Sequence, residues 1–151
     1  HPTTRLCLEW LARDAAVAGK QVLDYGCGSG ILAIAAVKLG AHAVTAIDID
    51  VDACRVAQEN AARNGCGEIT IVTPNALHQG TFDLIVANLL WRPVLDLQPE
   101  FSARLERNGR IGLSGLLRDQ VPSVLDAYAG PFKMDLPQFN EEWALITGTR
   151  R

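Results

Sequence analysis

One short segment near the start of the chain joins the pattern of a buried strand to three alternating glycines and the start of a helix. The mostly apolar residues 22–25 lead into Gly26, Gly28 and Gly30, and a helical pattern begins near Gly30. Alternating glycines allow a tight turn and a close approach of the backbone to a bound molecule. The free amides at the start of the helix suit ribose hydroxyls, a carboxylate or a pyrophosphate. The segment therefore predicts an α/β unit with a nucleotide-binding turn.

Strand and helix patterns alternate along the rest of the chain. We predict helices near residues 3–19, 30–39, 51–64, 93–107 and 117–128, with Thr3 or Thr4 as the first cap. Strands are predicted near residues 22–25, 43–48, 68–72, 82–87, 110–114, 132–136 and 143–147, with Asn108-Gly109 as a turn before the fifth. Because no helix separates the last two strands, the expected fold is a three-layer α/β sandwich. Its seven-stranded sheet is mostly parallel, with one antiparallel strand and helices on both faces.

Ligands in open sheets of this kind bind beyond the carboxyl ends of the strands, beside the first strand. The glycine turn, Asp48, residues 74–76, residues 88–93 and residues 114–115 are expected on that edge. If the last strand is the antiparallel one, residues 140–142 join them. Within that group, the exposed pair Glu141 and Glu142 is either a site that attracts a cationic substrate or an ordinary solvated acidic pair.

Asp48 ends the second predicted strand about 20 residues after the turn, where an acid accepts hydrogen bonds from ribose hydroxyls in such folds. The alternative is that Asp48 or Asp50 caps the helix that begins near Val51, and Asp50 is the better candidate for that cap. The two roles are compatible.

Asn88 follows the fourth predicted strand, beside the expected ligand site. Its amide can accept a hydrogen bond from an amine while it donates another, although an Asx turn is the simpler interpretation. Trp91 either shapes a channel for an alkyl chain or anchors its loop against the core. His78 is expected to be solvated, and Cys27 to be a small residue that fits the turn rather than a nucleophile.

Composition excludes several classes of protein. A chain of 151 residues fits one domain, and no apolar run is long enough to span a bilayer. The formal net charge of −3 gives no basic footprint for direct nucleic-acid binding and mildly favours a cationic partner. Four cysteines without a CxxC pair or a histidine cluster indicate neither a metal site nor a disulfide framework, which fits a reducing cytoplasm. The chain begins at His1, so we expect the natural product to be longer.

Several segments together resemble class I S-adenosylmethionine methyltransferases, namely residues 22–30, 46–50 and 86–90. Within this class, the chain resembles one bacterial family (PrmA), whose members trimethylate amino groups of the large-subunit ribosomal protein L-eleven. The segments that carry this narrower resemblance are residues 1–4, 59–61, 63–65 and 113–117. It covers nearly the whole chain. It implies a Rossmann-like methyltransferase fold for residues 1–151, S-adenosyl-L-methionine as cofactor, and N-methylation of lysine or other amino groups in the bacterial cytoplasm.

The resemblance also implies roles for individual residues. The family's cofactor contacts carry over to Thr4, Gly26, Asp48 and Asn88, and Asn88 is expected near the amine to be methylated. Members carry an amino-terminal domain that recognises the ribosomal protein, and this chain lacks it. Val51 stands where the family usually has proline, a change that should only loosen a helix start.

Combining these inferences, we expect Asp48 to bind the ribose and the glycine turn to bind the methionine end. Asn75-Ala76 is expected to contact the edge of the adenine. Asn88 is expected to orient the amine as the catalytic residue. No metal is expected. The predicted cofactor-binding residues are Thr4, Asp24, Gly26, Gly28, Gly30, Asp48, Asn75, Ala76 and Asn88.

Three other functions stay open. Residues 28–33 also fit the GxGxxA pattern of an NAD-dependent dehydrogenase. A cofactor-binding module without turnover is the second, because the recognition domain is missing. A nucleic-acid methyltransferase is the third, although the acidic balance and the lack of an Asn-Pro-Pro-aromatic motif at Asn88 count against it.

Overall fold

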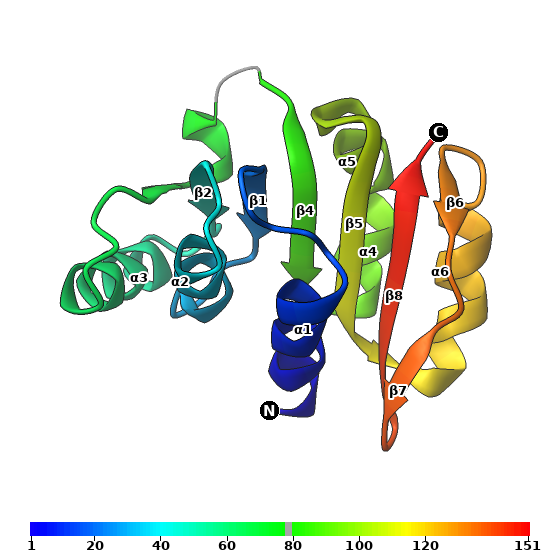
Figure 1. Cartoon of the computed structure of the whole chain (residues 1–151). Helices are drawn as coiled ribbons and strands as arrows, with labels where there is room; N and C mark the ends of the chain where they lie inside the picture. The colour runs from blue at the N-terminus through cyan, green and yellow to red at the C-terminus, as the bar shows by residue number, and fades with distance from the viewer. Residues whose placement is uncertain (78–79) are drawn as a thin grey trace.

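The computed structural model describes residues 1–77 and 80–151, and its strands form one eight-stranded sheet (Figure 1). The helical elements are α1 (Pro2–Arg13), α2 (Ile31–Lys38), α3 (Val51–Arg63), η1 (Pro74–Ala76), α4 (Trp91–Asp96), α5 (Gln98–Arg104), η2 (Arg118–Gln120) and α6 (Val121–Tyr128). The strands are β1 (Gln21–Tyr25), β2 (Ala43–Ile47), β3 (Thr70–Val72), β4 (Phe82–Asn88), β5 (Leu105–Leu117), β6 (Phe132–Met134), β7 (Gln138–Asn140) and β8 (Trp143–Arg150).

The strand order is β3-β2-β1-β4-β5-β8-β6, and β7 pairs with the first residues of β8. Strands β3, β2, β1, β4 and β5 are mutually parallel, whereas β8 runs antiparallel to β5, β6 and β7. The single antiparallel strand and the helices on both faces confirm the predicted architecture. The chain leaves β1 toward β2 on one side and returns to β4 on the other, so the switch point lies at the carboxyl end of β1.

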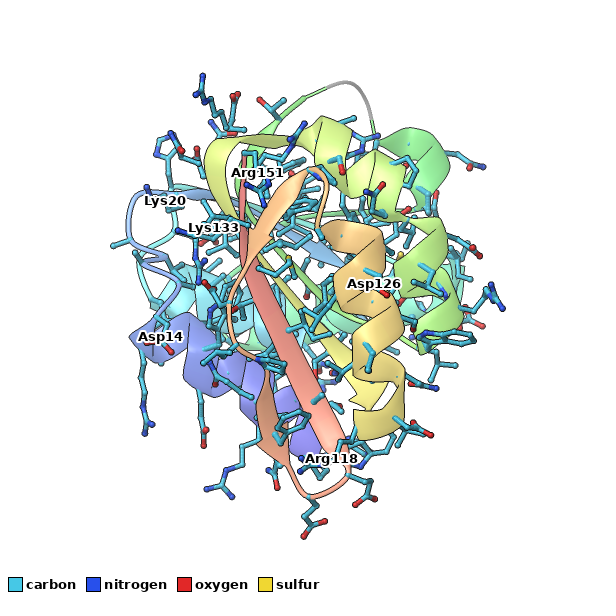
Figure 2. All side chains as sticks on the ribbon, turned by 90° about the vertical axis from the view of Figure 1, so that its right-hand side faces the viewer. Asp14, Lys20, Arg118, Asp126, Lys133 and Arg151 are labelled. Atoms are coloured by element: carbon cyan, nitrogen blue, oxygen red, sulfur yellow. The ribbon has the colours of Figure 1, made fainter. Side chains whose placement is uncertain are left out.

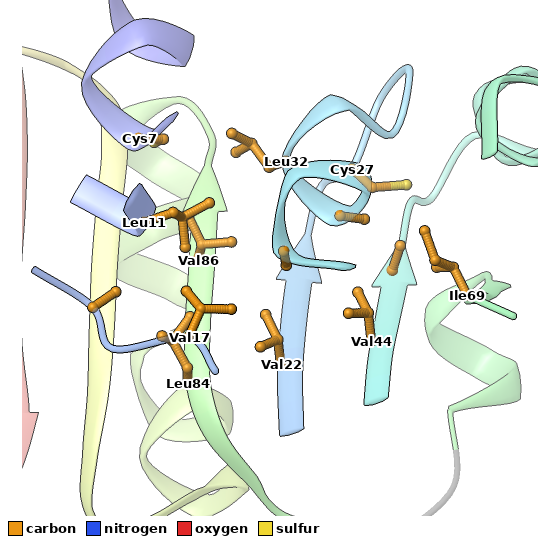
Figure 3. Packing of buried hydrophobic residues seen from close by; sticks show 14 of the residues in the cluster. Cys7, Leu11, Val17, Val22, Cys27, Leu32, Val44, Ile69, Leu84 and Val86 are labelled. Atoms are coloured by element: carbon orange, nitrogen blue, oxygen red, sulfur yellow. The ribbon is translucent and has the colours of Figure 1, made fainter. Parts of the chain in front are cut away.

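Alternation of side chains along the buried strands builds one core on each face of the sheet. Val22 and Leu84 pack with α1, α2 and α3, as Figure 3 shows for this cluster. Leu23 and Ile85, one position later on the same strands, pack with α4, α5 and α6. Because successive strand residues point to opposite faces, the mostly apolar pattern of β1 and β4 predicts burial on both sides.

The prediction of seven strands was wrong by one. The strand predicted at residues 132–136 ends at Met134, and the chain pairs with β8 again at β7. Pro137 interrupts the ladder between these two segments because proline has no amide hydrogen to donate. The predicted turn at Asn108-Gly109 is also wrong, since β5 runs through it. Asn108 has a positive φ of 69° there, and the pairing with β4 shifts register.

Three helix predictions also need correction. The first helix is capped by the His1 side chain rather than by a threonine, and it ends at Arg13. The helix predicted at 93–107 is two helices, because Pro99 cannot donate to the carbonyl one turn earlier and therefore starts a new one. The helix predicted from residue 117 begins as the 3-10 turn η2 and becomes α-helical at Val121.

Helix α1 packs across the sheet close to the arrowhead of β4 (Figure 1). Its Trp10 is buried directly over Gly112 of β5, where a Cβ atom would collide with the indole ring. The absence of a side chain at Gly112 therefore lets α1 approach the sheet. This packing brings the first turn of α1 to the carboxyl edge of the strands.

Candidate active site

Strand register brings the predicted site residues together. Tyr25 of β1 pairs with Ile47 on one side and with Ala87 on the other. Each of these three residues is followed directly by a predicted site residue: Gly26 follows Tyr25, Asp48 follows Ile47, and Asn88 follows Ala87. Parallel strands end at one edge, so three segments far apart in sequence start their loops side by side.

The glycine turn is held by backbone hydrogen bonds. The amides of Gly26 and Cys27 donate to the Ile47 carbonyl at 2.7 and 2.8 Å, and the Gly30 amide donates to the Cys27 carbonyl at 2.8 Å. All three glycines have positive φ, with values of 82°, 50° and 87° for Gly26, Gly28 and Gly30. This conformation favours glycine, and it confirms the predicted tight turn.

The three glycines meet different neighbours. A Cβ at Gly26 would collide with the Leu89 side chain, and one at Gly30 would lie 3.2 Å from the Cβ of Ala57. At Gly28 a Cβ would meet no atom within 4 Å. Close approach at the first and third glycines is thus to the protein itself, while the space beside Gly28 is open to a ligand.

Asp48 faces the turn from the end of β2. Its Oδ2 accepts a hydrogen bond from the Gly28 amide at 2.9 Å, and its Oδ1 accepts one from the Asp50 amide at 2.9 Å. Asp50 caps α3 by accepting from the Asp52 amide at 2.9 Å, so the capping role falls to Asp50 as expected. The Asp48 carboxylate is therefore fixed in place while each oxygen keeps a further lone pair for a ligand hydroxyl.

A cavity of about 280 Å³ lies beside Asp48, and its wall includes Tyr25, Gly26, Asp48, Ile49, Leu89, Pro93 and Leu97. Sequence reasoning missed its apolar wall. Ile49 is 82 % exposed although it lies between two aspartates at the ligand edge. A large apolar side chain at such a position was the available signal. Pro93 lies in the segment 88–93 that is expected on this edge from the sequence. Leu97 gave no signal, because only the packing of α4 brings it here.

A second cavity, of about 390 Å³, opens beside Asn88, and its wall includes His1, Thr3, Thr4, Asn88, Leu89, Leu90, Gly115 and Trp143. The Asn88 Nδ2 donates to the Thr4 Oγ1 at 3.5 Å, so α1 and β4 meet at this point. Sequence reasoning missed His1 and Trp143, whose rings make an edge-to-face contact at 4.9 Å. Trp143 reaches the site because β8 starts where β5 ends, as the pairing of Leu117 with Trp143 shows.

The comparisons with known proteins agree with this geometry. A family profile described as ribosomal protein L11 methyltransferase (PrmA) matches residues 1–151. The ribosomal protein L11 methyltransferase of Chromobacterium violaceum is 47 % identical in an alignment 152 residues long, which covers 100 % of this chain and 50 % of the relative. The chain belongs to the ribosomal protein L11 methyltransferase family. It spans about half the length of the curated relatives it matches.

Solved structures support the same assignment. The ribosomal protein L11 methylase from Lactobacillus delbrueckii subsp. bulgaricus superposes with a TM-score of 0.93 at 40 % identity, over 99 % of this chain and 79 % of that one. An RNA methyltransferase from Salinibacter ruber, solved with S-adenosyl-L-homocysteine, has a TM-score of 0.78 at 18 % identity, over 99 % and 94 % of the two chains. At that identity the second likeness shows the fold alone, a class I methyltransferase fold.

In this family member, Asp24 supports the turn from inside. It is fully buried, and its Oδ2 accepts from the Ala33 amide at 3.1 Å in the first turn of α2. Burial is the main cause that raises the pKa of its carboxyl to about 7, and the nearby Asp48 adds to it, while the Ala33 amide opposes the shift. The carboxyl reaches no open surface in this arrangement, and the cofactor role of Asp24 stays a prediction.

Other predicted residues lie around the same edge. Asn75 and Ala76 are exposed in η1 after β3, and Thr4 is half-buried. Trp91 anchors its loop, because its Nε1 donates to the Ser123 Oγ at 2.8 Å and the residue packs against the core. It also lines a cavity of about 300 Å³, and its role in a channel for an alkyl chain stays a prediction. Burial raises the pKa of the Cys27 thiol to about 12, with Asp24 and Asp48 adding to it, so this thiol stays neutral and is not an activated nucleophile.

Some classes of site are not found. His78 lies outside the described residues. Within residues 1–77 and 80–151, no group of three or more metal-binding side chains comes together. No helix in this described part of the chain is long and apolar enough to cross a membrane. Glu141 and Glu142 are exposed at the turn into β8, which places them on the ligand edge as expected.

Proposed function

We propose that the protein is an S-adenosylmethionine-dependent methyltransferase of the bacterial cytoplasm that N-methylates lysine or other amino groups of a ribosomal protein of the L11 type. Residues 1–151 are its catalytic domain, and substrate recognition lies in another part of the full protein. One observation carries the proposal. Leu89 lines both the cavity beside Asp48 and the cavity beside Asn88, so two binding sites share one wall.

The residues beside Asp48 fit S-adenosylmethionine. Open space at Gly28 leaves room for a ligand against the turn, and the Asp48 carboxylate offers acceptors for ribose hydroxyls. Ile49, Pro93 and Leu97 give the cavity apolar walls that suit the faces of an adenine ring. When bound, this cofactor supplies a methyl group on a positively charged sulfur.

The residues beside Asn88 suit an amine acceptor. The Asn88 Nδ2 donates to Thr4, which directs the amide oxygen to accept a hydrogen bond from a substrate amine. Leu89, Leu90 and Trp143 give the acceptor apolar and aromatic surroundings. A lysine ammonium has a pKa of about 10.4 in water and must lose a proton before it attacks, and burial lowers that pKa. Alignment and desolvation are therefore the tasks of this chain, and a catalytic base is not required.

The first test is calorimetric titration of the full-length protein with S-adenosylhomocysteine, S-adenosylmethionine and NAD. We expect the two sulfur compounds to bind and NAD not to bind. Binding of NAD alone would overturn the proposal in favour of a dehydrogenase.

The second test is methyl transfer to ribosomal protein L11, followed by mass spectrometry of the product. Mass gains of 14 Da per methyl group at amino groups are expected. Cofactor binding without any mass gain would favour a binding module without turnover, and transfer to RNA instead would overturn the substrate assignment.

A further inference from the structure

Asn60 on α3 reaches back to the glycine turn. Its Nδ2 donates a hydrogen bond to the Ser29 carbonyl at 2.9 Å. Asn60 is half-buried, whereas the Ser29 side chain is exposed. Ser29 lies between Gly28 and Gly30, which have positive φ values of 50° and 87°. The contact therefore joins α3 to the most deformable part of the turn.

The same face of α3 packs against the turn one helical turn earlier. A Cβ at Gly30 would lie 3.2 Å from the Cβ of Ala57, so the helix backbone approaches the turn closely. Ala57 and Asn60 are three residues apart, which places their side chains on one helix face. One face of α3 thus gives the turn both a van der Waals contact and a hydrogen bond.

The peptide unit between Ser29 and Gly30 is fixed at both ends. Its carbonyl accepts from Asn60, and its N–H donates to the Cys27 carbonyl at 2.8 Å. Because glycine tolerates many backbone conformations, a peptide unit next to it can rotate at small cost. The Asn60 hydrogen bond favours the one orientation in which the Ser29 carbonyl points at α3 and the N–H points into the turn.

We propose that Asn60 is a positioning residue for S-adenosylmethionine, acting through the Ser29–Gly30 peptide unit without touching the ligand. This inference rests on the proposed function. The turn is then shaped for the ligand before binding, so less conformational freedom is lost when the ligand arrives. Without Asn60 the turn samples other shapes, and part of the binding free energy is spent on selecting the right one.

The test compares Asn60→Ala and Asn60→Asp with Asn64→Ala in the full-length protein. Alanine removes the donor and favours the helix, so α3 stays folded. Aspartate keeps the size of the side chain but sets a carboxylate oxygen against the Ser29 carbonyl. Asn64, the C-cap of α3, is the matched control: its Nδ2 donates to the Asn60 carbonyl at 2.7 Å, and among the described residues its side chain makes no hydrogen bond to the turn.

Three measurements distinguish positioning from general stability. For Asn60→Ala we expect the Kd of S-adenosylhomocysteine to rise about three- to tenfold, with kcat at saturating cofactor changed by less than about twofold. The aspartate variant should bind more weakly still. Hydrogen exchange of residues 26–33 in the ligand-free protein should be faster in both Asn60 variants and unchanged in Asn64→Ala.

Wild-type affinity and exchange in both Asn60 variants would overturn the inference. An equal loss in Asn64→Ala would also overturn it, because the cause would then be the stability of α3. If the wild-type protein bound no S-adenosylhomocysteine, the proposed function would fail, while the ligand-free exchange would still decide whether Asn60 orders the turn.

Discussion

At the scale of single residues, Leu89 connects the two halves of the site. Its side chain fills the space over Gly26, and its backbone carbonyl occupies the space over Gly115 at the end of β5. Its amide donates to the Ser114 carbonyl at 3.0 Å. Leu89 is therefore held between the turn after β1 and strand β5, which lie on either side of β4. Asp48 and Asn88 lie on opposite sides of this shared wall, so the tasks proposed for them can be tested separately.

Replacing Asn88 by alanine tests the amine side of that wall. Asn88→Ala removes the amide oxygen that is proposed to align the acceptor, and loss of alignment costs about 100-fold in rate. We expect kcat for methylation of ribosomal protein L11 to fall by at least that factor in a radiometric assay of the full-length protein. Asn64→Ala is the control and should keep the wild-type rate. Full activity in the Asn88 variant would disprove the assignment.

Replacing Asp48 tests the cofactor side. Asp48→Ala loses a charged acceptor for the ligand and the hydrogen bond to the Gly28 amide, and hydrogen bonds to charged groups contribute about 1.5–3 kcal/mol. The Kd of S-adenosylhomocysteine should rise roughly 10- to 100-fold in calorimetry. Asp126→Ala, at an exposed position on α6 (Figure 2), should bind as the wild type does. Unchanged affinity in Asp48→Ala would rule out the ribose role.

At the scale of elements, the position of α1 determines whether the cavity beside Asn88, the proposed acceptor site, is enclosed on the side of this helix. Thr3 and Thr4 of this helix line the cavity beside Asn88. The helix is fixed by Trp10, whose ring covers Gly112 of β5. A glycine in the middle of a strand weakens the strand itself, but here it makes room for an aromatic side chain of the covering helix.

A methyl group at Gly112 should separate these two elements. In Gly112→Ala the new Cβ collides with the Trp10 indole, and overpacking of this kind costs about 1–3 kcal/mol. We expect a lower urea midpoint by fluorescence or circular dichroism. Gly130→Ala is the matched control, because a Cβ there meets no atom within 4 Å, and its midpoint should stay near that of the wild type. Equal midpoints for both variants would contradict this view of α1.

At the scale of the whole molecule, a carboxyl is buried in the centre of the fold. Asp24 is fully buried between β1 and α2, and its Oδ1 has no hydrogen-bond partner within the described residues. Burial raises its pKa to about 7 in the folded protein, whereas an aspartate in an unfolded chain has a pKa of about 3.9. Between these two values the folded state keeps a proton that the unfolded state has released. The contribution of Asp24 to stability is therefore greatest below pH 4 and falls as the pH rises toward 7.

Asp24→Asn should remove this pH dependence. The free energy of unfolding of the wild type, relative to the variant, should fall by up to about 1.4 kcal/mol per pH unit between pH 4 and 7 and then level off. Urea titrations at several pH values measure the difference. Asp14→Asn, at an exposed position after α1 (Figure 2), is the control, and its free energy of unfolding should change with pH as that of the wild type does. If the difference in the free energy of unfolding between wild type and Asp24→Asn stayed constant from pH 4 to 7, Asp24 would be ionised in the folded protein throughout that range.

Prediction from sequence succeeded where a local pattern has one physical solution. Alternating glycines after an apolar strand permit the positive φ angles of a tight turn, so the turn at Gly26, Gly28 and Gly30 was predictable. An aspartate directly before a helix predicts a cap, and Asp50 is one. Prediction failed at short and interrupted elements. The three-residue strand β7 is too short to show an alternating pattern of apolar and polar residues. Whether Asn108-Gly109 ends a strand or bends it depends on the partner strand.

The sequence by itself determined the alternation of the longer strands and helices, the glycine turn, and the strand ends at Asp48 and Asn88, because each of these follows from residues close together in the chain. Tertiary structure decided which distant side chains complete the site. Leu97, Trp143 and the first turn of α1 reach it only because the packing of α4, the antiparallel β8 and the space over Gly112 set their positions. Contacts between segments that are far apart in the chain depend on packing in three dimensions, and no local pattern of residues encodes them.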